Sequence, residues 1–252
     1  MATEELRIIP VRVSSDIKPG DSLAEKLLQA LKKKRLTLAK GDILVVKHKI
    51  VSKAEGQLVR LDSVKPSPSS RSWARRYGLD ARVTELALRQ SKKVIRQKNG
   101  VLITETRHGF ICANSGVDVS NVDGGQHALL LPENPDRSAA ALHGELKKRV
   151  KLAIPVIISD SFGRPWREGL TEVAIGIAGM KAAHDYRGKI DPHGYKLRVS
   201  LDAVADELAC AGGLLSGKLT STPFVIIRGF RYQPGRGIAR DLLRPAAHDL
   251  FR

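Results

Sequence analysis

The chain has 252 residues, of which 42% are hydrophobic and 27% are charged, and this composition excludes disordered, collagen-like and mucin-like proteins. Its 43 lysines and arginines outnumber its 26 aspartates and glutamates, and the net charge of +17 indicates an anionic partner: a phosphorylated small substrate, a membrane surface or nucleic acid. No apolar stretch reaches the roughly 18 residues of a membrane span, and the opening residues do not resemble a secretion signal, so we expect a cytoplasmic protein with no membrane partner.

The N-terminal third of the chain predicts a helix between an apolar run and a strand, followed by a loop. Residues 6–13 form an apolar run, and Ser22 and Glu25 have capping-box spacing, so a helix should begin there. The β-branched content of residues 43–51 predicts a strand along that whole stretch. Residues 62–80 are rich in proline and serine, which predicts a loop containing a short packed helix.

Beyond residue 80, helices and strands follow one another in a mixed order. The expected helices cover residues 81–97, 135–150 and 201–215. The expected strands are a hairpin pair at residues 101–106 and 110–113, a buried strand at 154–158, and a last strand at 223–227. This order predicts an α+β fold with mixed or antiparallel sheets and packed helices, rather than a doubly wound parallel sheet.

Four basic clusters account for much of the positive charge: residues 32–35, 71–76, 92–98 and 147–151. Each is interleaved with apolar residues at helical spacing, so we interpret all four as solvated helix faces. Aromatic residues make up only 4% of the chain, and no zinc-finger or RNP signature is present, which argues against nucleic-acid binding. Cys112 and Cys210 lack metal-type spacing and are interpreted as small core residues.

The first candidate site is the loop at residues 112–121, where glycine and asparagine allow a sharp turn after a strand. Asp118 can then project into a cleft, and its hard carboxylate oxygens would suit Mg²⁺ or Mn²⁺. A capped turn explains the same residues equally well, because Asn and Asp are common in loops for local hydrogen bonding. Spacing alone leaves both interpretations open.

The second candidate site is the run at residues 159–167, which follows a buried strand. The strand would hold Asp160 rigidly, with the Ser161 hydroxyl beside it, and Arg164 and Arg167 offer forked donors for phosphate or carboxylate. An ordinary strand-to-turn junction has no need of Trp166 and two arginines, so we favour the site.

Two further stretches carry weaker signals. Lys53 follows a predicted strand and could contact a phosphate, although isolated surface lysines are far commoner than phosphate-binding ones. Residues 212–222 resemble a phosphate loop in composition only, since the Gly-x4-Gly-Lys-Ser/Thr spacing is absent, and Gly217 is also a candidate helix C-cap. His108, His184 and His193 are interpreted as hydrogen-bonding loop residues.

Three strings occur together and in order: residues 51–56, 105–118 and 158–167. They resemble the coenzyme F420 gamma-glutamyl ligases, and the likeness continues at residues 171–179, 202–209, 228–229 and 249–252, so it spans nearly the whole chain. The resemblance implies a GTP-dependent ligase that joins L-glutamate to the lactyl carboxylate of F420-0 through an acyl phosphate, often adding further gamma-linked glutamates.

The resemblance also implies an architecture and a set of partners. Residues 1–252 would form a single ligase unit of two interleaved α+β subdomains, with their boundary left open, in an intertwined homodimer. GTP and two divalent ions, Mg²⁺ or Mn²⁺, would bind in a groove at the dimer interface, and K⁺ is a further candidate ion. F420-0 and L-glutamate are the other expected partners.

Site residues follow from the same resemblance. Asp118, Asp160 and Ser161 match metal ligands, and Asp118, Asp160, Lys53 and Arg164 are the expected catalytic residues. The expected nucleotide contacts are Arg12, Val13, Ser14, Ser15, His48, Lys49, Lys53, Asn121, Leu215, Ser216, Gly217, Lys218, Leu219, Thr220, Ser221 and Thr222. Lys218 stands where some family members offer an acidic or amide side chain to the second metal, so the ligands of that ion remain open.

Two alternatives remain. A related amide ligase could use another amino acid or another anionic acceptor. A nucleic-acid-binding module would use the basic surface but would leave the carboxylate loops without a role.

Overall fold

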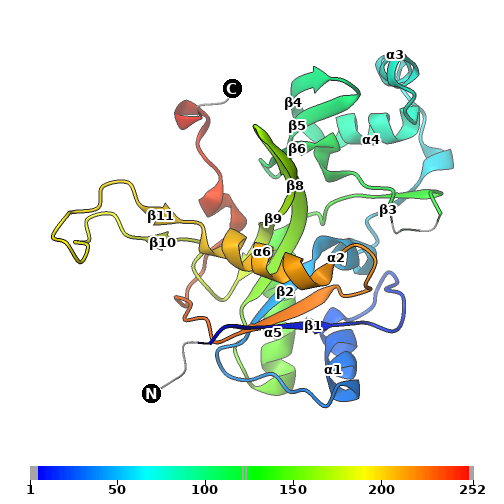
Figure 1. Ribbon diagram of the computed structural model, residues 1–252. Helices are drawn as coiled ribbons and strands as arrows, with labels where there is room; N and C mark the ends of the chain where they lie inside the picture. The colour runs from blue at the N-terminus through cyan, green and yellow to red at the C-terminus, as the bar shows by residue number, and fades with distance from the viewer. Residues whose placement is uncertain (1–4, 121, 123, 250–252) are drawn as a thin grey trace.

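The centre of the fold is a five-stranded mixed sheet, seen here in a computed structural model that describes residues 5–120, 122 and 124–249 (Figure 1). The strand order is β1-β12-β2-β8-β9. Only β2 and β8 run parallel; every other neighbouring pair is antiparallel. The strands are β1 (Arg7–Val11), β2 (Ile43–Lys47), β8 (Val156–Arg164), β9 (Arg167–Ala178) and β12 (Phe224–Arg228).

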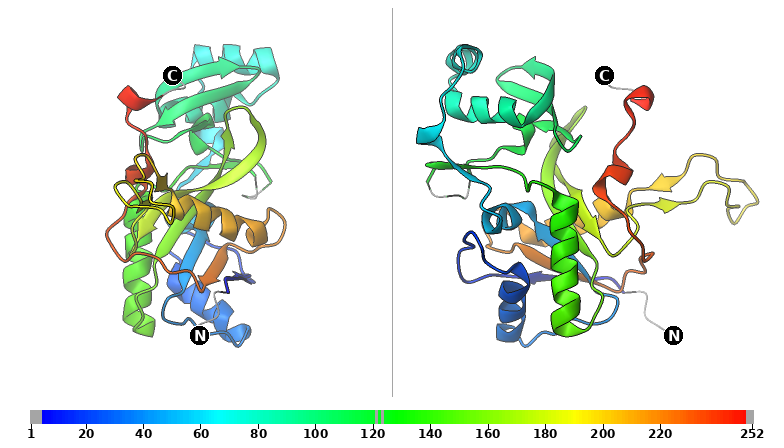
Figure 2. Two further views of the ribbon diagram at one scale, coloured as in Figure 1. Left: turned by 60° about the vertical axis from the view of Figure 1, so that its left-hand side comes forward. Right: turned by 180° about the vertical axis from the view of Figure 1, so that it is seen from behind.

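Helices cover both faces of this sheet, which explains why its inner strands are almost continuously apolar. Helix α6 (Val204–Ser216) lies on one face, and α1 (Leu23–Lys33) and α5 (Pro135–Val150) lie on the other (Figure 2). The predicted starts of α1 and α5 are confirmed, because the Ser22 hydroxyl accepts a hydrogen bond from the Glu25 amide and Asn134 caps α5. The helix expected to begin at residue 201 begins at Val204, because residues 201–202 pair as a strand with residues 184–185.

A smaller set of elements packs around a hydrophobic cluster of its own, at the top of Figure 1. It contains α3 (Pro68–Tyr77), α4 (Ala81–Gln90), the sheet β4 (Ser91–Lys98), β5 (Val101–Thr106) and β6 (Ile111–Ala113), and the pair β3 (Leu58–Arg60) and β7 (His127–Leu129). The cluster consists of Leu61, Val64, Leu86, Ala87, Leu102, Val117, Ala128 and Leu130. The mixed α+β class predicted from the sequence is therefore confirmed.

The remaining elements are short. Helix α2 (His48–Ala54) follows β2, and β10 (His184–Asp185) pairs with β11 (Leu201–Asp202) at the base of a projecting arm (Figure 1). The 3₁₀ turns are η1 (Leu61–Ser63), η2 (Asn114–Gly116), η3 (Ala239–Leu242) and η4 (Ala246–His248). None of the helices in the described ranges is long and apolar enough to cross a bilayer.

Two element predictions were wrong. The strand expected at 43–51 ends at Lys47, and α2 begins at His48. As part of this helix, Val51 packs into the central core, and the packing outweighs its intrinsic preference for a strand. The helix expected at 81–97 ends at Gln90, and β4 follows because residues 91–98 pair with β5. The basic cluster at 92–98 therefore lies on an edge strand and not on a helix face.

The strand expected at 154–158 also extends further than predicted. Strand β8 reaches Arg164 and pairs with β9 as far as Arg167, so the two strands form a long hairpin. The first residues of β8 lie in the core, whereas the tip of the hairpin is exposed. Asp160 and Ser161 lie midway along β8, at the transition from core to surface.

Candidate functional site

The candidate site lies at the carboxyl end of β2, where its parallel pairing with β8 ends. The register places Lys47, the last residue of β2, beside Ser159 of β8. The next residues are therefore His48 and Lys49 in the first turn of α2 and Asp160 and Ser161 on β8. Carboxyl ends of adjacent strands commonly form binding sites in sheets of this kind, because side chains from both strands converge there.

Asp160 is held from two directions. His48 is only 2% exposed, and its Nδ1 lies 3.1 Å from Asp160 Oδ1. The Ser161 amide donates to the same oxygen at 2.7 Å. Within the described ranges, no hydrogen bond reaches Oδ2 of Asp160, so this oxygen is available to a ligand.

Asp118 lies over the same turn of α2. Its Oδ2 is 2.7 Å from Lys49 Nζ, and its Oδ1 accepts the Ser120 amide at 2.7 Å. Burial disfavours the charged form of Asp118, but hydrogen bonds from Lys49 and Ser120 outweigh that effect and lower the pKa of the carboxyl. Asp118 and Asp160, which are distant in the sequence, thus contact consecutive residues in the first turn of α2.

Ser161 belongs to a third group of contacts, which sequence reasoning missed. Its hydroxyl donates to Glu172 Oε1 at 2.6 Å, and the Ser159 hydroxyl donates to Glu172 Oε2 at 2.7 Å. Lys47 forms an ion pair with the same Glu172 carboxylate. Glu172 faces Ser161 directly across the β8–β9 hairpin, a register that only the structure supplies.

A basic cavity of about 540 Å³ lies beside α2. The segments at residues 12–15 and 215–222 meet around it, joined by a hydrogen bond from the Val13 amide to the Ser221 carbonyl. Its lining residues are Val13, Ser14, Ser15, Asp16, Ile17, Lys47, Lys49, Ile50, Lys53, Gly217, Lys218, Leu219, Ser221, Thr222 and Pro223. Most of the expected nucleotide contacts are therefore gathered around one cavity.

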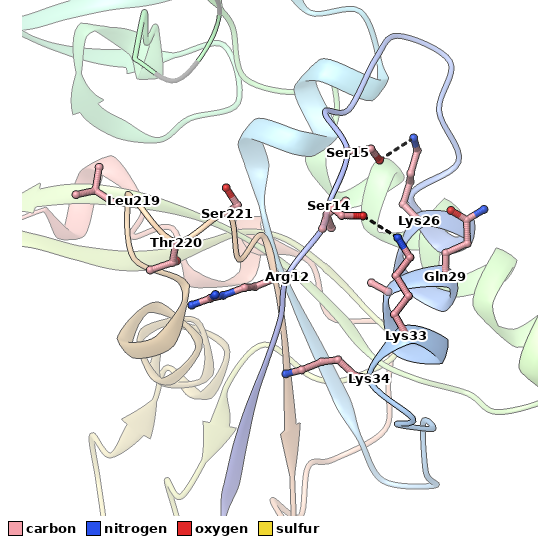
Figure 3. Close-up of a pocket in the computed structure, with 12 residues that line it drawn as sticks. Arg12, Ser14, Ser15, Lys26, Gln29, Lys33, Lys34, Leu219, Thr220 and Ser221 are labelled. Atoms are coloured by element: carbon pink, nitrogen blue, oxygen red, sulfur yellow. Dashed lines mark hydrogen bonds between the residues drawn. The ribbon is translucent and has the colours of Figure 1, made fainter.

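A second cavity of about 610 Å³ adjoins the first and shares Val13, Ser14, Ser15, Leu219 and Ser221 with it (Figure 3). Arg12 and Thr220 line this second cavity, together with Lys26 and Lys33 of α1 and Lys34, which caps that helix. Lys33 donates to the Ser14 hydroxyl at 2.9 Å, and Lys26 lies 3.5 Å from the Ser15 hydroxyl (Figure 3). Part of the basic cluster at 32–35, interpreted as a solvated face, thus lines a cavity. Nothing in the local sequence indicates that α1 lies beside residues 12–15.

Leu215, Ser216 and Arg164 do not line either cavity. Leu215 and Ser216 belong to the last turn of α6, and Gly217, which lines the first cavity, ends that helix at φ +52°, which confirms the C-cap interpretation. Arg164 is exposed near the tip of the β8–β9 hairpin, where it donates to the Glu168 carbonyl at 3.2 Å. Asn121 lies outside the described residues.

The carboxylates and the Ser161 hydroxyl supply hard oxygen donors of the kind that Mg²⁺ and Mn²⁺ prefer. Among the described residues, no group of three or more His, Cys, Asp and Glu side chains could hold a metal ion. A divalent ion here would take few protein ligands and complete its shell with water or phosphate oxygens, as Mg²⁺ commonly does. The residues present fit such an ion.

Cys112 lies near this site but has the wrong properties for a nucleophile. Burial, together with the negative charge of Asp160, raises the pKa of its thiol to about 12. A reactive thiolate requires a lowered pKa. Covalent catalysis by Cys112 is therefore disfavoured, in agreement with its interpretation as a core residue.

Comparison with known proteins points to one family. Residues 12–229 match the family model described as F420-0:Gamma-glutamyl ligase. The chain is 41% identical to the coenzyme F420:L-glutamate ligase of Methanopyrus kandleri over 98% of both chains. It is 43% identical to the enzyme of that name from Methanothermobacter thermautotrophicus, over 92% of this chain and 93% of the relative. It is also 41% identical to the coenzyme F420:L-glutamate ligase of Methanocaldococcus jannaschii, over 84% of this chain and 85% of the relative.

Proposed function

The chain belongs to the F420-0:gamma-glutamyl ligase family and is a ligase that forms carbon–nitrogen bonds, and we propose that it joins L-glutamate to F420-0 with conversion of GTP to GDP and phosphate. The observation that carries this proposal is that Asp160 contacts His48 and Asp118 contacts Lys49, in the first turn of α2, and that Lys49 also lines the basic cavity. Such a site suits a substrate with a polyphosphate chain.

The chemistry explains why a nucleotide is needed. A carboxylate is a poor electrophile, so we propose that its oxygen first attacks the γ-phosphorus of GTP, which releases GDP and forms an acyl phosphate. The amine of glutamate then attacks the acyl carbon, phosphate leaves, and the amine loses a proton. Neither step requires a covalent bond to the protein.

The residues of the chain would bind and orient the reactants. Asp118, Asp160 and the Ser161 hydroxyl would hold Mg²⁺ or Mn²⁺, which supplies charge neutralisation at the phosphate oxygens. Lys49 and Lys53 line the cavity and would contact phosphate, and Lys53 is already held in place by Asp16 at 3.1 Å. Positioning and charge neutralisation account for most of the rate enhancement in phosphoryl transfer.

We further propose that the protein acts as a homodimer, in which the projecting arm at residues 184–202 takes part (Figures 1 and 2). The arm carries large apolar side chains at high exposure, including Ile190 at 71% and Val199 at 87%. Exposed apolar groups concentrated on one segment are typical of protein interfaces.

The proposed reaction has a direct test. Purified protein incubated with F420-0, GTP, Mn²⁺ and L-glutamate is expected to yield F420 bearing one or more glutamyl residues, detected by mass spectrometry, together with GDP. Parallel reactions with other amino acids or other anionic acceptors would identify a relative with a different substrate. Folded protein that forms no glutamylated product from F420-0 would contradict the proposal.

A further inference from the structure

Glu172 is a buried charged residue next to the candidate site, and none of the proposed steps uses it. It is 9% exposed and lies on β9, directly across the hairpin from Ser161. Cross-strand neighbours in antiparallel pairs project to the same face, so their side chains meet. Leaving a carboxylate buried carries a large free-energy penalty unless donors compensate it, so the partners of Glu172 are informative.

Three donors surround this carboxylate. Both the Ser161 hydroxyl and the Lys47 ammonium contact Oε1, and the Ser159 hydroxyl contacts Oε2. Lys47 supplies the compensating positive charge and also lines the 540 Å³ cavity. The Glu172 carboxylate therefore connects a predicted metal ligand to a cation at the cavity wall.

Helix α6 fixes the position of this side chain. A Cβ atom on Gly213 would lie only 2.5 Å from Glu172 Cγ, so the absence of a side chain at Gly213 makes room for Glu172. The Cys210 thiol of the same helix donates to the Glu172 carbonyl at 3.1 Å. Glu172 is thus held between α6 and β8 with little freedom to change rotamer.

The consequence for Ser161 follows from the valence of a hydroxyl. A serine hydroxyl has one proton and two lone pairs. Because the proton is donated to Glu172, the lone pairs of Ser161 point away from that carboxylate and are free to act as a ligand.

We propose that Glu172 is a positioning residue of the ligase: it orients the Ser161 hydroxyl as a ligand for the divalent cation and holds the Lys47 ammonium at the wall of the cavity. This inference rests on the proposed function. It predicts that removal of the Glu172 charge weakens cation binding through Ser161, an effect that a purely structural ion pair would not produce.

The test measures Mn²⁺ binding to the full-length protein without nucleotide, by the electron paramagnetic resonance signal of free Mn²⁺. Glu172→Gln is expected to weaken Mn²⁺ affinity about 10- to 100-fold, the range found when groups that orient metal ligands are replaced. In a protein that already carries Ser161→Ala, Glu172→Gln is expected to weaken Mn²⁺ binding little further. Both substitutions remove the same contact, the one between the Ser161 hydroxyl and the cation, so their effects do not add.

Asp206→Asn is the matched control, since Asp206 also joins α6 to β9, accepting the Ala174 amide at 2.8 Å, but contacts neither Ser161 nor Lys47. It should bind Mn²⁺ like the wild type. If Glu172→Gln does not fold, Glu172→Asp takes its place. Aspartate keeps the negative charge, but its side chain is one methylene shorter and does not reach the Ser161 hydroxyl, so Mn²⁺ binding should again be weaker than in the wild type. If either folded variant of Glu172 binds Mn²⁺ as tightly as the wild type does, the inference is overturned. The proposed function is tested separately, by product formation in the wild type.

Discussion

An Asp160→Asn variant is expected to lose at least about a hundredfold in kcat for glutamylation, while its unfolding temperature stays close to that of the wild type. Asparagine keeps the shape of the side chain and an acceptor for the Ser161 amide, but it removes the negative charge next to His48. Removing one preorganised electrostatic group from a site of this type usually costs about 10²- to 10³-fold in rate. Steady-state kinetics at saturating GTP and Mn²⁺ measure the effect.

Asp136→Asn is the matched control for this experiment. Asp136 is also a half-buried carboxylate, but it lies at the start of α5, where its Oδ1 accepts the amides of Ile177 and Ala239 at 2.9 Å. Its replacement should affect stability and leave kcat near the wild-type value. A folded Asp160→Asn variant with wild-type kcat would exclude a role for this carboxylate in the reaction.

Replacing Arg228 by methionine is expected to lower the free energy of unfolding by about 3–5 kcal/mol. Asp42 is fully buried, and Arg228 binds both of its oxygens, at 2.7 and 2.8 Å. The hydrogen bond to Asp42 raises the pKa of Arg228, as expected for a closely held pair. Methionine fills a similar volume but leaves a buried carboxylate without its cation. Urea denaturation at pH 7 gives the free energy of unfolding directly.

An exposed pair of the same residue types provides the comparison. Arg60 and Asp62 form an ion pair in which both side chains are mostly solvated. Arg60→Met should therefore change stability little, because exposed ion pairs contribute little. Equal effects of the two substitutions would mean that the burial of Asp42 does not determine the stability of this pair.

Elements with strong local signals could be predicted from the sequence. Helix α1 begins after Ser22 because a side-chain cap is encoded within four residues, and residues 154–158, the last three of which begin β8, are apolar throughout. The segments at 48–54 and 91–98 could not be predicted, because their states depend on contacts with distant parts of the chain. Val51 packs into the central core as part of helix α2, and residues 91–98 form a strand because they pair with β5.

Some residues of the candidate site could likewise be predicted from the sequence, and others could not. Asp118 and Asp160 could be proposed because each follows or ends a strand in a segment with small and polar neighbours. Glu172 carried no such signal, since its importance comes from the hairpin register that places it opposite Ser161. The α1 lysines had the appearance of a solvated face, and only the packing of α1 beside residues 12–15 places them at a cavity.

The most direct test of the central claim is to locate Mn²⁺ by anomalous scattering in crystals grown with GDP and Mn²⁺. The expected result is a peak within coordination distance of Asp118, Asp160 or both, in one site that also contacts the phosphates of the nucleotide. A structure in which GDP and Mn²⁺ bind elsewhere, with the two carboxylates still paired only to His48 and Lys49, would contradict the account.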